Sequence, residues 1–460
     1  MKFSPQALRQ VLEPYVSAKR WYLGFSGGLD STALLHALVQ LRFLGEWPDK
    51  EIIAVHVNHA LSVRADQWQQ HCKAICLQLG IRFIAEKVTV EAAGEGIEAA
   101  ARNARFAVFA SLLKPEDVLL LAHHRDDQAE TLLLRLLRGA GARGLAAMAE
   151  CRPFAGGKMI RPLLSFSRPA LVNYVTEQGL CWLEDDSNRS EQFDRNFLRQ
   201  SILPQLEARW PQLSRRWSRT AQNLGDNESA LADLADIDLQ TCAGEAARLG
   251  WRVNRSAFAA LSTARRHNLV RFWCERHHLP RPEFNHLQRL DGLLDRERAD
   301  KLAVQWRGAE LRSYQQYLYL LPSLIPPSGI SQCSGPNLPL APESILALPD
   351  GSELVATKAP GGLVNGLESL EVRWRQGGER SQPNARNHSQ TLKKLLQEYA
   401  LEPWLRDRVP LVYAGDTLVA VADLWIGRGF QAADDQQGLR LRWRYPANAG
   451  TAIHIRSNSN

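Results

Sequence analysis

The strongest constraint on the fold is a glycine-containing turn between an apolar run and a helical pattern. The run Trp21–Phe25 predicts a buried strand and passes directly into Ser26-Gly27-Gly28-Leu29-Asp30-Ser31. Apolar residues at Ala33, Leu34 and Leu38 then predict a helix. Backbone N–H groups at a helix N-terminus attract anions, and glycine lets a phosphate approach the backbone closely. We therefore predict a phosphate-binding loop at residues 26–31.

This loop differs from the common nucleotide-binding loop. The pattern G-x-x-x-x-G-K-[ST] is missing from the sequence, since Gly156-Gly157-Lys158 is followed by Met159. A surface serine-glycine turn is the alternative, and the strand before the loop and the helix after it argue against that interpretation. The loop resembles the PP-loop of the ATP pyrophosphatases. This resemblance implies ATP cleavage between the alpha and beta phosphates, which releases pyrophosphate and leaves AMP on the substrate.

Further apolar runs predict the rest of the first domain. The runs Ile52–Val57, Arg82–Val88 and Val118–Ala122 are separated by stretches with a helical pattern. Strands that alternate with helices predict an α/β fold with a doubly wound parallel sheet. In such sheets ligands bind beyond the carboxyl ends of the strands, where Asn58-His59 and His123-His124 stand.

A charged cluster begins where the run Val118–Ala122 ends. Asp127 and Glu130 are three residues apart, so on a helix they share a face. Carboxylates beside bound phosphates commonly hold Mg²⁺. We therefore predict Asp30 and Asp127 as catalytic residues and Mg²⁺ ligands. The alternative is an ordinary first helical turn, in which Asp126 is the cap and Glu130 faces solvent.

Two other patterns have plain structural interpretations. Glu98, Arg102 and Arg105 form one charged stripe on a predicted helix, which is typical of a solvated face. The segment Gly139–Gly144 matches G-x-G-x-x-G, but it follows the helical pattern Thr131–Arg138 instead of a strand. We interpret that segment as a loop that ends a helix.

The charge of the chain favours a polyanionic partner. The net charge is +7 and the isoelectric point is near 9.1. Arginines adjoin aromatic residues in Arg209-Trp210, Arg215-Arg216-Trp217 and Arg271-Phe272-Trp273, a pairing that suits phosphate contacts and stacking on RNA bases. Buried tryptophans beside solvated arginines are the structural alternative. Nucleic acid is the leading candidate.

Length and composition predict several domains. A chain of 460 residues exceeds one ordinary core. The region from about Ile202 to about Arg298 is rich in Arg, Ala and Leu with few strand signals, which predicts helices. Prolines concentrated in residues 321–342 predict a linker, and the apolar runs beyond it, around a helix at Thr391–Tyr399, predict a small α+β domain.

Cysteine usage and hydropathy bear on the compartment. The seven cysteines include no C-x-x-C pair, which argues against a disulfide framework or a structural zinc site. Cys72 and Cys76 are spaced like one buried face of a helix. No secretion signal is evident, and no apolar run approaches the ~20 residues that span a bilayer. We therefore expect a cytoplasmic protein without a membrane partner.

The motifs together resemble the tRNA(Ile)-lysidine synthetase family, in order and spacing, over nearly the whole chain. One departure is Ala60, where the family commonly has glycine. The matching elements are Ser26–Ser31, His56-Val57-Asn58-His59, Gly96-Ile97-Glu98 with Arg102 and Arg105, His123–Thr131, Arg161-Pro162-Leu163-Leu164, Asp185-Asp186-Ser187-Asn188, Asp194–Arg199, Gly377-Gly378-Glu379-Arg380, Leu392-Lys393-Lys394-Leu395 and Pro403-Trp404-Leu405-Arg406.

This resemblance implies a reaction and its partners. ATP and Mg²⁺ would activate the 2-oxo group of the wobble cytidine of an isoleucine tRNA with a CAU anticodon, and free L-lysine would then displace AMP to give lysidine. Residues Ser26, Gly27, Gly28, Leu29, Asp30 and Ser31 would bind ATP. The residues expected to position lysine, ATP or the nucleotide are Arg102, Arg105, His123, Glu130 and Arg195.

The resemblance also implies a division into domains. The expected parts are a PP-loop catalytic domain at 1–205, a helical tRNA-binding middle domain at 206–325, a linker at 326–345 and a C-terminal tRNA-recognition domain at 346–460. The oligomeric state stays open, with a homodimer among the alternatives.

Rival functions make different demands on the sequence. A tRNA thiolase of the same superfamily needs sulfur delivered by cysteines, and the missing C-x-x-C pair argues against it. A tRNA-binding protein without activity would not need its acidic residues, Asp30, Asp126, Asp127 and Glu130. Glutamine-dependent amidation lacks a recognisable glutaminase segment.

Overall fold

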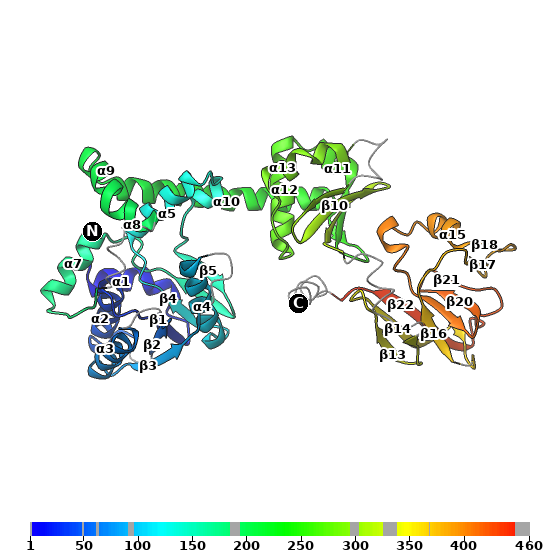
Figure 1. Cartoon of the computed structure of the whole chain (residues 1–460), viewed down its shortest axis with the longest axis horizontal. Coiled ribbons are helices and arrows are strands. Elements are labelled where there is room, and N and C mark those ends of the chain that lie inside the picture. The colour runs from blue at the N-terminus through cyan, green and yellow to red at the C-terminus, as the bar shows by residue number, and fades with distance from the viewer. Residues whose placement is uncertain are drawn as a thin grey trace. The chain divides into compact units, whose positions relative to one another are not determined.

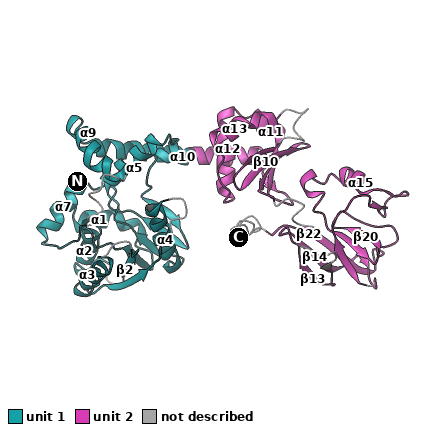
Figure 2. Ribbon diagram, viewed as in Figure 1, with its two compact units in different colours: residues 1–230 teal, residues 231–460 magenta. Residues whose placement is uncertain are grey.

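The protein is described here by a computed structural model. It covers residues 2–47, 50–60, 64–90, 96–184, 194–294, 303–324, 338–367 and 369–446, without the side chains of Glu98 and Leu338. The chain forms two compact units, residues 1–230 and 231–460 (Figure 2), and the boundary lies inside helix α10 (Leu213–Thr241).

The domain limits inferred from the sequence stay a prediction. Much of the predicted linker at 326–345 lies outside the described residues, and residues 338–345 contain strand β12 and the start of β13. The motif Asp185–Asn188 also lies outside the described residues.

Unit 1 is built on the predicted sheet. Its described strands are ordered β3-β2-β1-β4-β6-β5, and all neighbours are parallel except β5 against β6 (Figure 1). The doubly wound parallel sheet is therefore confirmed. The strands are β1 (Arg20–Gly24), β2 (Glu51–Asn58), β3 (Arg82–Lys87), β4 (Val118–Leu120), β5 (Cys151–Phe154) and β6 (Gly157–Ile160).

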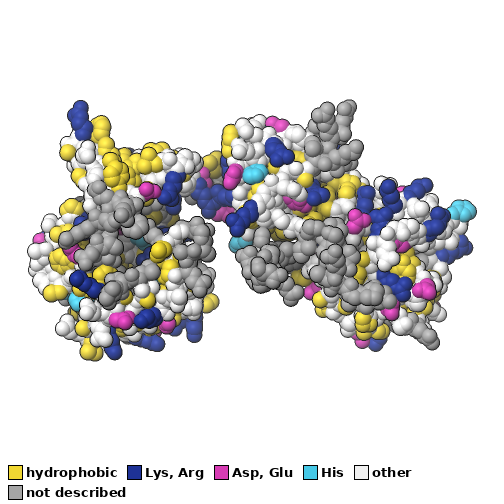
Figure 3. Space-filling view, in the orientation of Figure 1, with side chains coloured by type: hydrophobic (Ala, Val, Ile, Leu, Met, Phe, Trp, Pro, Cys, Tyr) yellow, Lys and Arg dark blue, Asp and Glu magenta, His cyan; other side chains and the backbone are white. Residues whose placement is uncertain are grey.

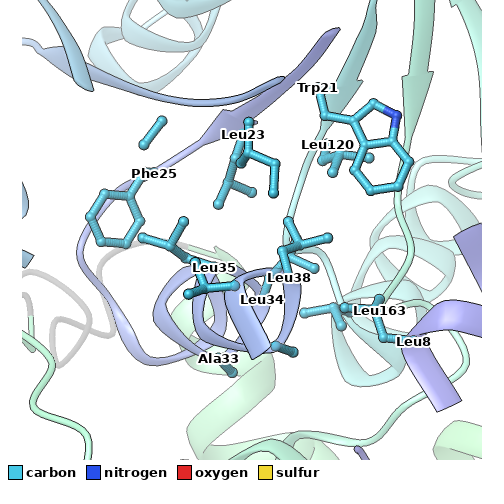
Figure 4. Packing of buried hydrophobic residues seen from close by; sticks show 14 of the residues in the cluster. Leu8, Trp21, Leu23, Phe25, Ala33, Leu34, Leu35, Leu38, Leu120 and Leu163 are labelled. Carbon is cyan, nitrogen blue, oxygen red and sulfur yellow. The ribbon is translucent and has the colours of Figure 1, made fainter. Parts of the chain in front are cut away.

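Helices cover both faces of this sheet, because successive side chains of each strand point to opposite faces and both sets are apolar. Trp21 and Leu23 of β1 pack on one face, whereas Tyr22 packs on the other. Figure 4 shows the first face, where β1 lies on α2. The helices of unit 1 are α1 (Pro5–Leu12), α2 (Leu29–Phe43), α3 (Ala65–Gln78), α4 (Ile97–Leu112), α5 (Arg125–Leu137), α6 (Ala142–Leu145), α7 (Arg168–Glu177), α8 (Asp194–Phe197), the π-helical segment Leu198–Ile202 and α9 (Leu203–Arg209), followed by the first part of α10.

The strand order determines where a ligand binds. Strand β1 lies between β2 and β4, so the chain leaves β1 towards one edge of the sheet and later returns to its other side. Ligands of open α/β sheets bind at such a switch point, beyond the carboxyl ends of the two strands. In this chain the residues there are the loop at 26–31 and the segment that begins at His123.

The middle region contains the predicted helices and, in addition, a sheet that the sequence analysis did not predict. Its helices are the rest of α10, α11 (Arg255–Ala260), α12 (Thr263–Arg276) and α13 (Phe284–Gln288). The described strands form an antiparallel sheet ordered β7-β8-β11-β10-β9. They are β7 (Glu245–Ala246), β8 (Trp251–Asn254), β9 (Ala303–Trp306), β10 (Ala309–Tyr314) and β11 (Tyr317–Pro322). These strands are short, and pairing partners distant in sequence stabilise them more than local propensity does.

The C-terminal region is the predicted α+β unit. Helix α15 (Leu392–Glu398) and the pair β19 and β20 match the predicted elements. Two described antiparallel sheets are ordered β12-β16-β19-β20-β21 and β13-β14-β22-β15, and β17 pairs with β18. The strands are β12 (Leu338–Pro339), β13 (Ser344–Ala347), β14 (Glu353–Pro360), β15 (Leu363–Val364), β16 (Leu370–Arg373), β17 (Arg380–Ser381), β18 (Gln390–Thr391), β19 (Leu411–Ala414), β20 (Thr417–Val421), β21 (Trp425–Ile426) and β22 (Gln437–Arg444).

Surface composition varies among the elements. Over α5 and the first part of α10, hydrophobic side chains gather among charged ones (Figure 3). Leu136 and Leu137 at the end of α5 and Phe197 of α8 are exposed. Among the described helices, none is both long enough and apolar enough to cross a bilayer.

Candidate active site

The loop at 26–31 is held by its own side chains. The hydroxyl groups of Ser26 and Ser31 are 3.1 Å apart, and Ser31 Oγ donates to the Gly28 carbonyl oxygen at 3.1 Å. Gly28 caps α2, and no side chain caps that helix end. The first backbone N–H groups of α2 therefore stay available to an anion, as the sequence predicted.

The two glycines of the loop serve different purposes. Gly27 has φ +79°, and a Cβ there would lie 2.7 Å from the sulfur of the buried Cys72. The protein itself therefore requires glycine at position 27. Gly28 has φ −78° and ψ 168°, and a Cβ there would make only ordinary contacts, 3.4 Å to Ser26 Oγ and 3.9 Å to the Leu183 carbonyl oxygen. Nothing in the described protein requires glycine at position 28; the predicted close approach of a phosphate would explain the glycine there.

The segment after β4 forms a capping box at the start of α5. His124 is the N-cap: its Nδ1 accepts from the Asp127 N–H at 3.3 Å, and Asp127 Oδ2 accepts from the His124 N–H at 2.9 Å. The interpretation of Asp126 as the cap is therefore wrong. Asp126 Oδ2 instead accepts from the backbone N–H of Arg168 at 2.7 Å.

Two arginines hold the carboxylates of α5. Asp127 Oδ1 accepts from Arg195 Nη2 at 3.0 Å and from Arg199 Nη2 at 2.9 Å. Glu130 Oε2 accepts from Arg195 Nε at 2.8 Å, and Glu130 Oε1 accepts from Arg199 Nε at 2.6 Å. The side chain of Glu130 is 1% exposed, so the alternative of a solvent-facing Glu130 is wrong. We call these four residues the Arg-carboxylate cluster.

The charges of the cluster stabilise one another. Burial alone raises the pKa of Asp127, but its electrostatic interactions with His124 and Arg195 outweigh that effect and lower the pKa to about 2. Burial lowers the pKa of Arg195, and the carboxylates of Asp127 and Glu130 more than reverse that effect. Asp127 is therefore an anion, and Arg195 a cation, at neutral pH.

Asp30 lies beside the cluster with a free oxygen. Its Oδ2 is 3.7 Å from His124 Nε2, and its Oδ1 is buried without a hydrogen-bond partner among the described residues. Burial raises the pKa of Asp30, and the charge of His124 opposes that rise. A carboxylate oxygen with no donor fits a divalent cation that also binds phosphate oxygens.

Asp127 fits such a cation less directly, since both of its oxygens already accept hydrogen bonds. Among the described residues no group of three or more His, Cys, Asp or Glu side chains has the geometry of a metal site. This donor set suits Mg²⁺, which is usually bound by one or two carboxylates together with substrate phosphates.

Unpartnered polar atoms gather at this switch point. Buried donors and acceptors normally find partners, so such a group indicates a ligand. Six buried polar atoms in or next to the predicted ligand-binding segments have no partner within the described part of unit 1. They are Asp30 Oδ1, Thr32 Oγ1, His59 Nδ1, His71 Nε2, His123 Nδ1 and Arg125 Nε. They come from the starts of α2 and α5, the ends of β2 and β4, and α3.

The other predicted positioning residues lie near this group. Burial lowers the pKa of His123 to about 3, with Asp127 partly opposing the shift, so His123 is neutral and can exchange hydrogen bonds. The guanidinium groups of Arg102 and Arg105 lie 5.0 and 5.9 Å from the ring centre of Phe106. Arg105 contributes to lowering the pKa values of His59 and His123, which places its charge near the site. Their roles in positioning substrates stay predictions.

Ala60 adopts the conformation for which the family's glycine is suited. Its φ is +53°, and its N–H donates to Asn58 Oδ1 at 2.9 Å. An alanine in the left-handed region is strained. The turn after β2 is thus kept in this chain despite the substitution.

Sequence reasoning missed part of the site. Arg199 was noted only as the end of the matching segment Asp194–Arg199, yet it binds Asp127 and Glu130 as closely as Arg195 does. The four-residue spacing of the two arginines was the signal that could have paired them. His71, whose ring lies 3.9 Å from the Cβ position of Gly27, carried no signal.

Comparison with known proteins agrees with this geometry. The family model for the PP-loop domain matches residues 2–206, and the models for the TilS substrate binding domain and the TilS substrate C-terminal domain match residues 254–319 and 370–443. The tRNA(Ile)-lysidine synthase of Pseudomonas syringae pv. tomato is 41% identical over 451 residues, covering 96% of this chain and 96% of that protein. This chain belongs to the tRNA(Ile)-lysidine synthase family.

Other relatives extend the comparison. The tRNA(Ile)-lysidine synthase of Coxiella burnetii is 36% identical and covers 96% of this chain and 97% of its own length. Among solved structures, the U34-tRNA thiolase NcsA of Methanococcus maripaludis is 17% identical, covers 48% of this chain and 77% of its own, and has a TM-score of 0.41, too low to support an argument. The family is one of ligases that modify tRNA, and its PP-loop domain implies ATP binding.

Proposed function

We propose that this protein joins free L-lysine to C2 of the wobble cytidine of an isoleucine tRNA with a CAU anticodon, and consumes ATP to AMP and pyrophosphate. The observation that carries the proposal is the phosphate loop beside the Arg-carboxylate cluster at the switch point of the sheet, in a chain similar over its whole length to the lysidine synthases.

The chemistry requires two bond exchanges. The 2-oxo oxygen of cytidine forms a bond to the alpha phosphorus of ATP, and the bond to pyrophosphate breaks. A lysine amine then forms a bond to C2, the C2–O bond breaks, AMP leaves with the oxygen, and the amine loses a proton. Adenylation makes the oxygen a leaving group, and binding of the three substrates together supplies proximity. The target base leaves its stack at little cost in a single-stranded loop.

The residues of the site have distinct roles in this proposal. The loop at 26–31 and the start of α2 bind the pyrophosphate moiety of ATP. Asp30 offers its free oxygen to Mg²⁺, with the negative charge of Asp127 nearby; the ion would neutralise charge on the phosphates. Arg102, Arg105, His123, Glu130 and Arg195 position lysine, ATP or cytidine. The compartment is the cytoplasm, where tRNA and ATP are present.

The test is the incorporation of labelled lysine into a transcript of the isoleucine tRNA, with and without ATP, beside the methionine tRNA with the same anticodon. ATP-dependent labelling of the isoleucine tRNA alone is expected. Pyrophosphate release without labelling would favour a different second substrate, as in a thiolase. Neither pyrophosphate release nor labelling, with tRNA still bound, would favour the tRNA-binding protein without activity.

A substitution in the Arg-carboxylate cluster tests whether the cluster takes part in the reaction. Asp127→Asn keeps the size of the side chain but removes a charge that two guanidinium groups contact, so we expect turnover to fall about a hundredfold or more. Asp233→Asn, an exposed change on α10, is the matched control and should turn over normally. Normal turnover of Asp127→Asn would refute the proposed role of Asp127.

A further inference from the structure

Unit 1 contains a groove that no part of the reaction above uses. Two hollows adjoin along α10, one of about 950 Å³ and one of about 440 Å³. Both are lined by Arg125, Ser165 and Arg215, so they form a single groove, which we call the α10 groove. The starts of α5, α7 and α10 all line the larger hollow. Side chains already accept from backbone N–H groups at these three helix starts, so a ligand would be held by the side chains of the groove.

Four of the five arginines that line the α10 groove are available to a ligand, and the fifth, Arg199, is held in the Arg-carboxylate cluster. Arg168, Arg215 and Arg219 are exposed and have no ion pair within the described residues. Arg125 donates only to the Ser165 carbonyl oxygen, at 3.4 Å, and its Nε is buried without a partner. Elsewhere in the chain other arginines are ion-paired, as Arg265 is with Asp238. The exposed arginines of the groove show no such carboxylate partner among the described residues.

The carboxylates of the groove mostly have partners within the protein. Asp126 accepts from the Arg168 N–H, and Glu207 accepts from the N–H groups of Gln212 and Leu213 at 2.6 and 2.9 Å. Glu130 is held by the Arg-carboxylate cluster. Asp226, in the smaller hollow, is the one acidic lining residue for which the described residues show no such partner. Five arginines and four carboxylates line the two hollows, so the lining carries a small net positive charge.

The spacing on α10 matches an extended ligand. Arg215, Arg219, Asn223 and Asp226 recur every three or four residues, so they share a helix face. Ser218 and Gln222 line the same hollow and add hydroxyl and amide groups. Repeated cations interleaved with uncharged hydrogen-bonding groups suit a chain of phosphates and ribose hydroxyls.

From this arrangement we infer that the α10 groove binds the phosphate backbone of the substrate tRNA next to the target cytidine. The inference rests on the proposed function for the identity of the RNA. The larger hollow is also lined by Glu130 and Arg199 of the Arg-carboxylate cluster, so an RNA chain in the groove reaches the reacting groups. The groove therefore guides the strand while the cluster and the PP-loop perform the chemistry.

The test compares arginines on one helix. Arg219→Gln removes a cation from the groove, and Arg216→Gln removes an exposed cation that lines neither hollow. Affinity for the isoleucine tRNA is measured with the full-length protein by filter binding over a salt series. One lost phosphate contact should weaken binding about fivefold near 0.15 M salt and reduce the salt slope by about one, and Arg215→Gln/Arg219→Gln should double both effects on a logarithmic scale.

Turnover separates this inference from the proposed function. At saturating tRNA, Arg215→Gln/Arg219→Gln should keep kcat for lysine incorporation while KM for tRNA rises, and Arg215→Lys/Arg219→Lys should keep the salt slope. Equal losses in Arg216→Gln and Arg219→Gln, or an unchanged slope in the double variant, would overturn the inference. Failure of the wild type to incorporate lysine would refute the proposed function, while the binding comparison would still decide the groove.

Discussion

Gly27 and Gly28 are adjacent, yet the structure predicts opposite consequences for their replacement by alanine. An alanine at position 27 meets two costs: a left-handed backbone, about 1–2 kcal/mol, and a Cβ 2.7 Å from Cys72 Sγ. Cys72 is fully buried and cannot move aside freely, so overpacking adds about 1–3 kcal/mol. Alanine also lowers the conformational entropy of the unfolded chain, which stabilises the folded protein by roughly 0.5–1 kcal/mol. The net loss is about 2–4 kcal/mol.

Gly28→Ala should leave stability within about 1 kcal/mol, because the backbone conformation suits any residue and the nearest atom, Ser26 Oγ, is 3.4 Å away. Its effect should fall on ATP, since a methyl group would stand where phosphate meets the start of α2. We expect at least about a tenfold loss of affinity.

Calorimetric unfolding of the full chain and titration with ATP measure the two effects separately. A loss of 2–4 kcal/mol should lower the melting temperature of the unit 1 transition by roughly 5–15 °C for Gly27→Ala. Adding Cys72→Ala removes the sulfur contact, so a double-mutant cycle should give a coupling of about 1–3 kcal/mol. Equal destabilisation by Gly27→Ala and Gly28→Ala, or no coupling to Cys72, would refute this account of the loop.

Three further changes test neighbouring parts of the site. Ala60→Gly should stabilise the protein by about 0.5–1 kcal/mol in urea unfolding, because glycine relieves the strain at φ +53°; lower stability would mean that the turn is not strained. Glu130→Gln should destabilise by about 3 kcal/mol, since Arg195 and Arg199 lose a buried counter-charge, whereas the exposed Glu177→Gln should change stability by less than about 1 kcal/mol. The folded pKa of His123, about 3, lies below its usual 6.5, so its contribution to stability is full above pH 6.5 and is lost as pH falls from there towards 3. His123→Gln should therefore reduce the loss of stability between pH 6.5 and about pH 5 by about 1 kcal/mol, and an unchanged acid limb would contradict the lowered pKa.

The sequence alone predicted the parts of the fold and site that are formed by residues contiguous in the chain. The strand before Ser26, the turn and the start of α2 are contiguous, so their pattern predicted the strand, turn and helix that the structure shows. The parallel sheet followed from the spacing of its apolar runs, because strands buried on both faces are nearly continuous in hydrophobicity.

The sequence did not predict contacts between residues that are distant in the chain. Glu130 and Asp126 could be assigned as solvent-facing and capping only while Arg199 and Arg168 were unplaced, 69 and 42 residues away. The sheet of β7 to β11 was missed for the same reason, since β8 pairs with β11 across more than sixty residues. Long-range pairing carries little local signal.

One turn of α5 connects the two surfaces of unit 1. Successive residues of a helix differ by roughly 100° in direction, so Arg125 and Asp126 line the α10 groove while Asp127 holds Arg195 and Arg199. His124 caps this turn through both its backbone and its ring. A change that loosens the cap would therefore alter the cluster and the groove together, whereas a change at Arg219 would affect the groove and spare the cluster. In the proposed reaction, this single turn allows an RNA strand in the groove and a nucleotide at the PP-loop to reach the same pair of carboxylates.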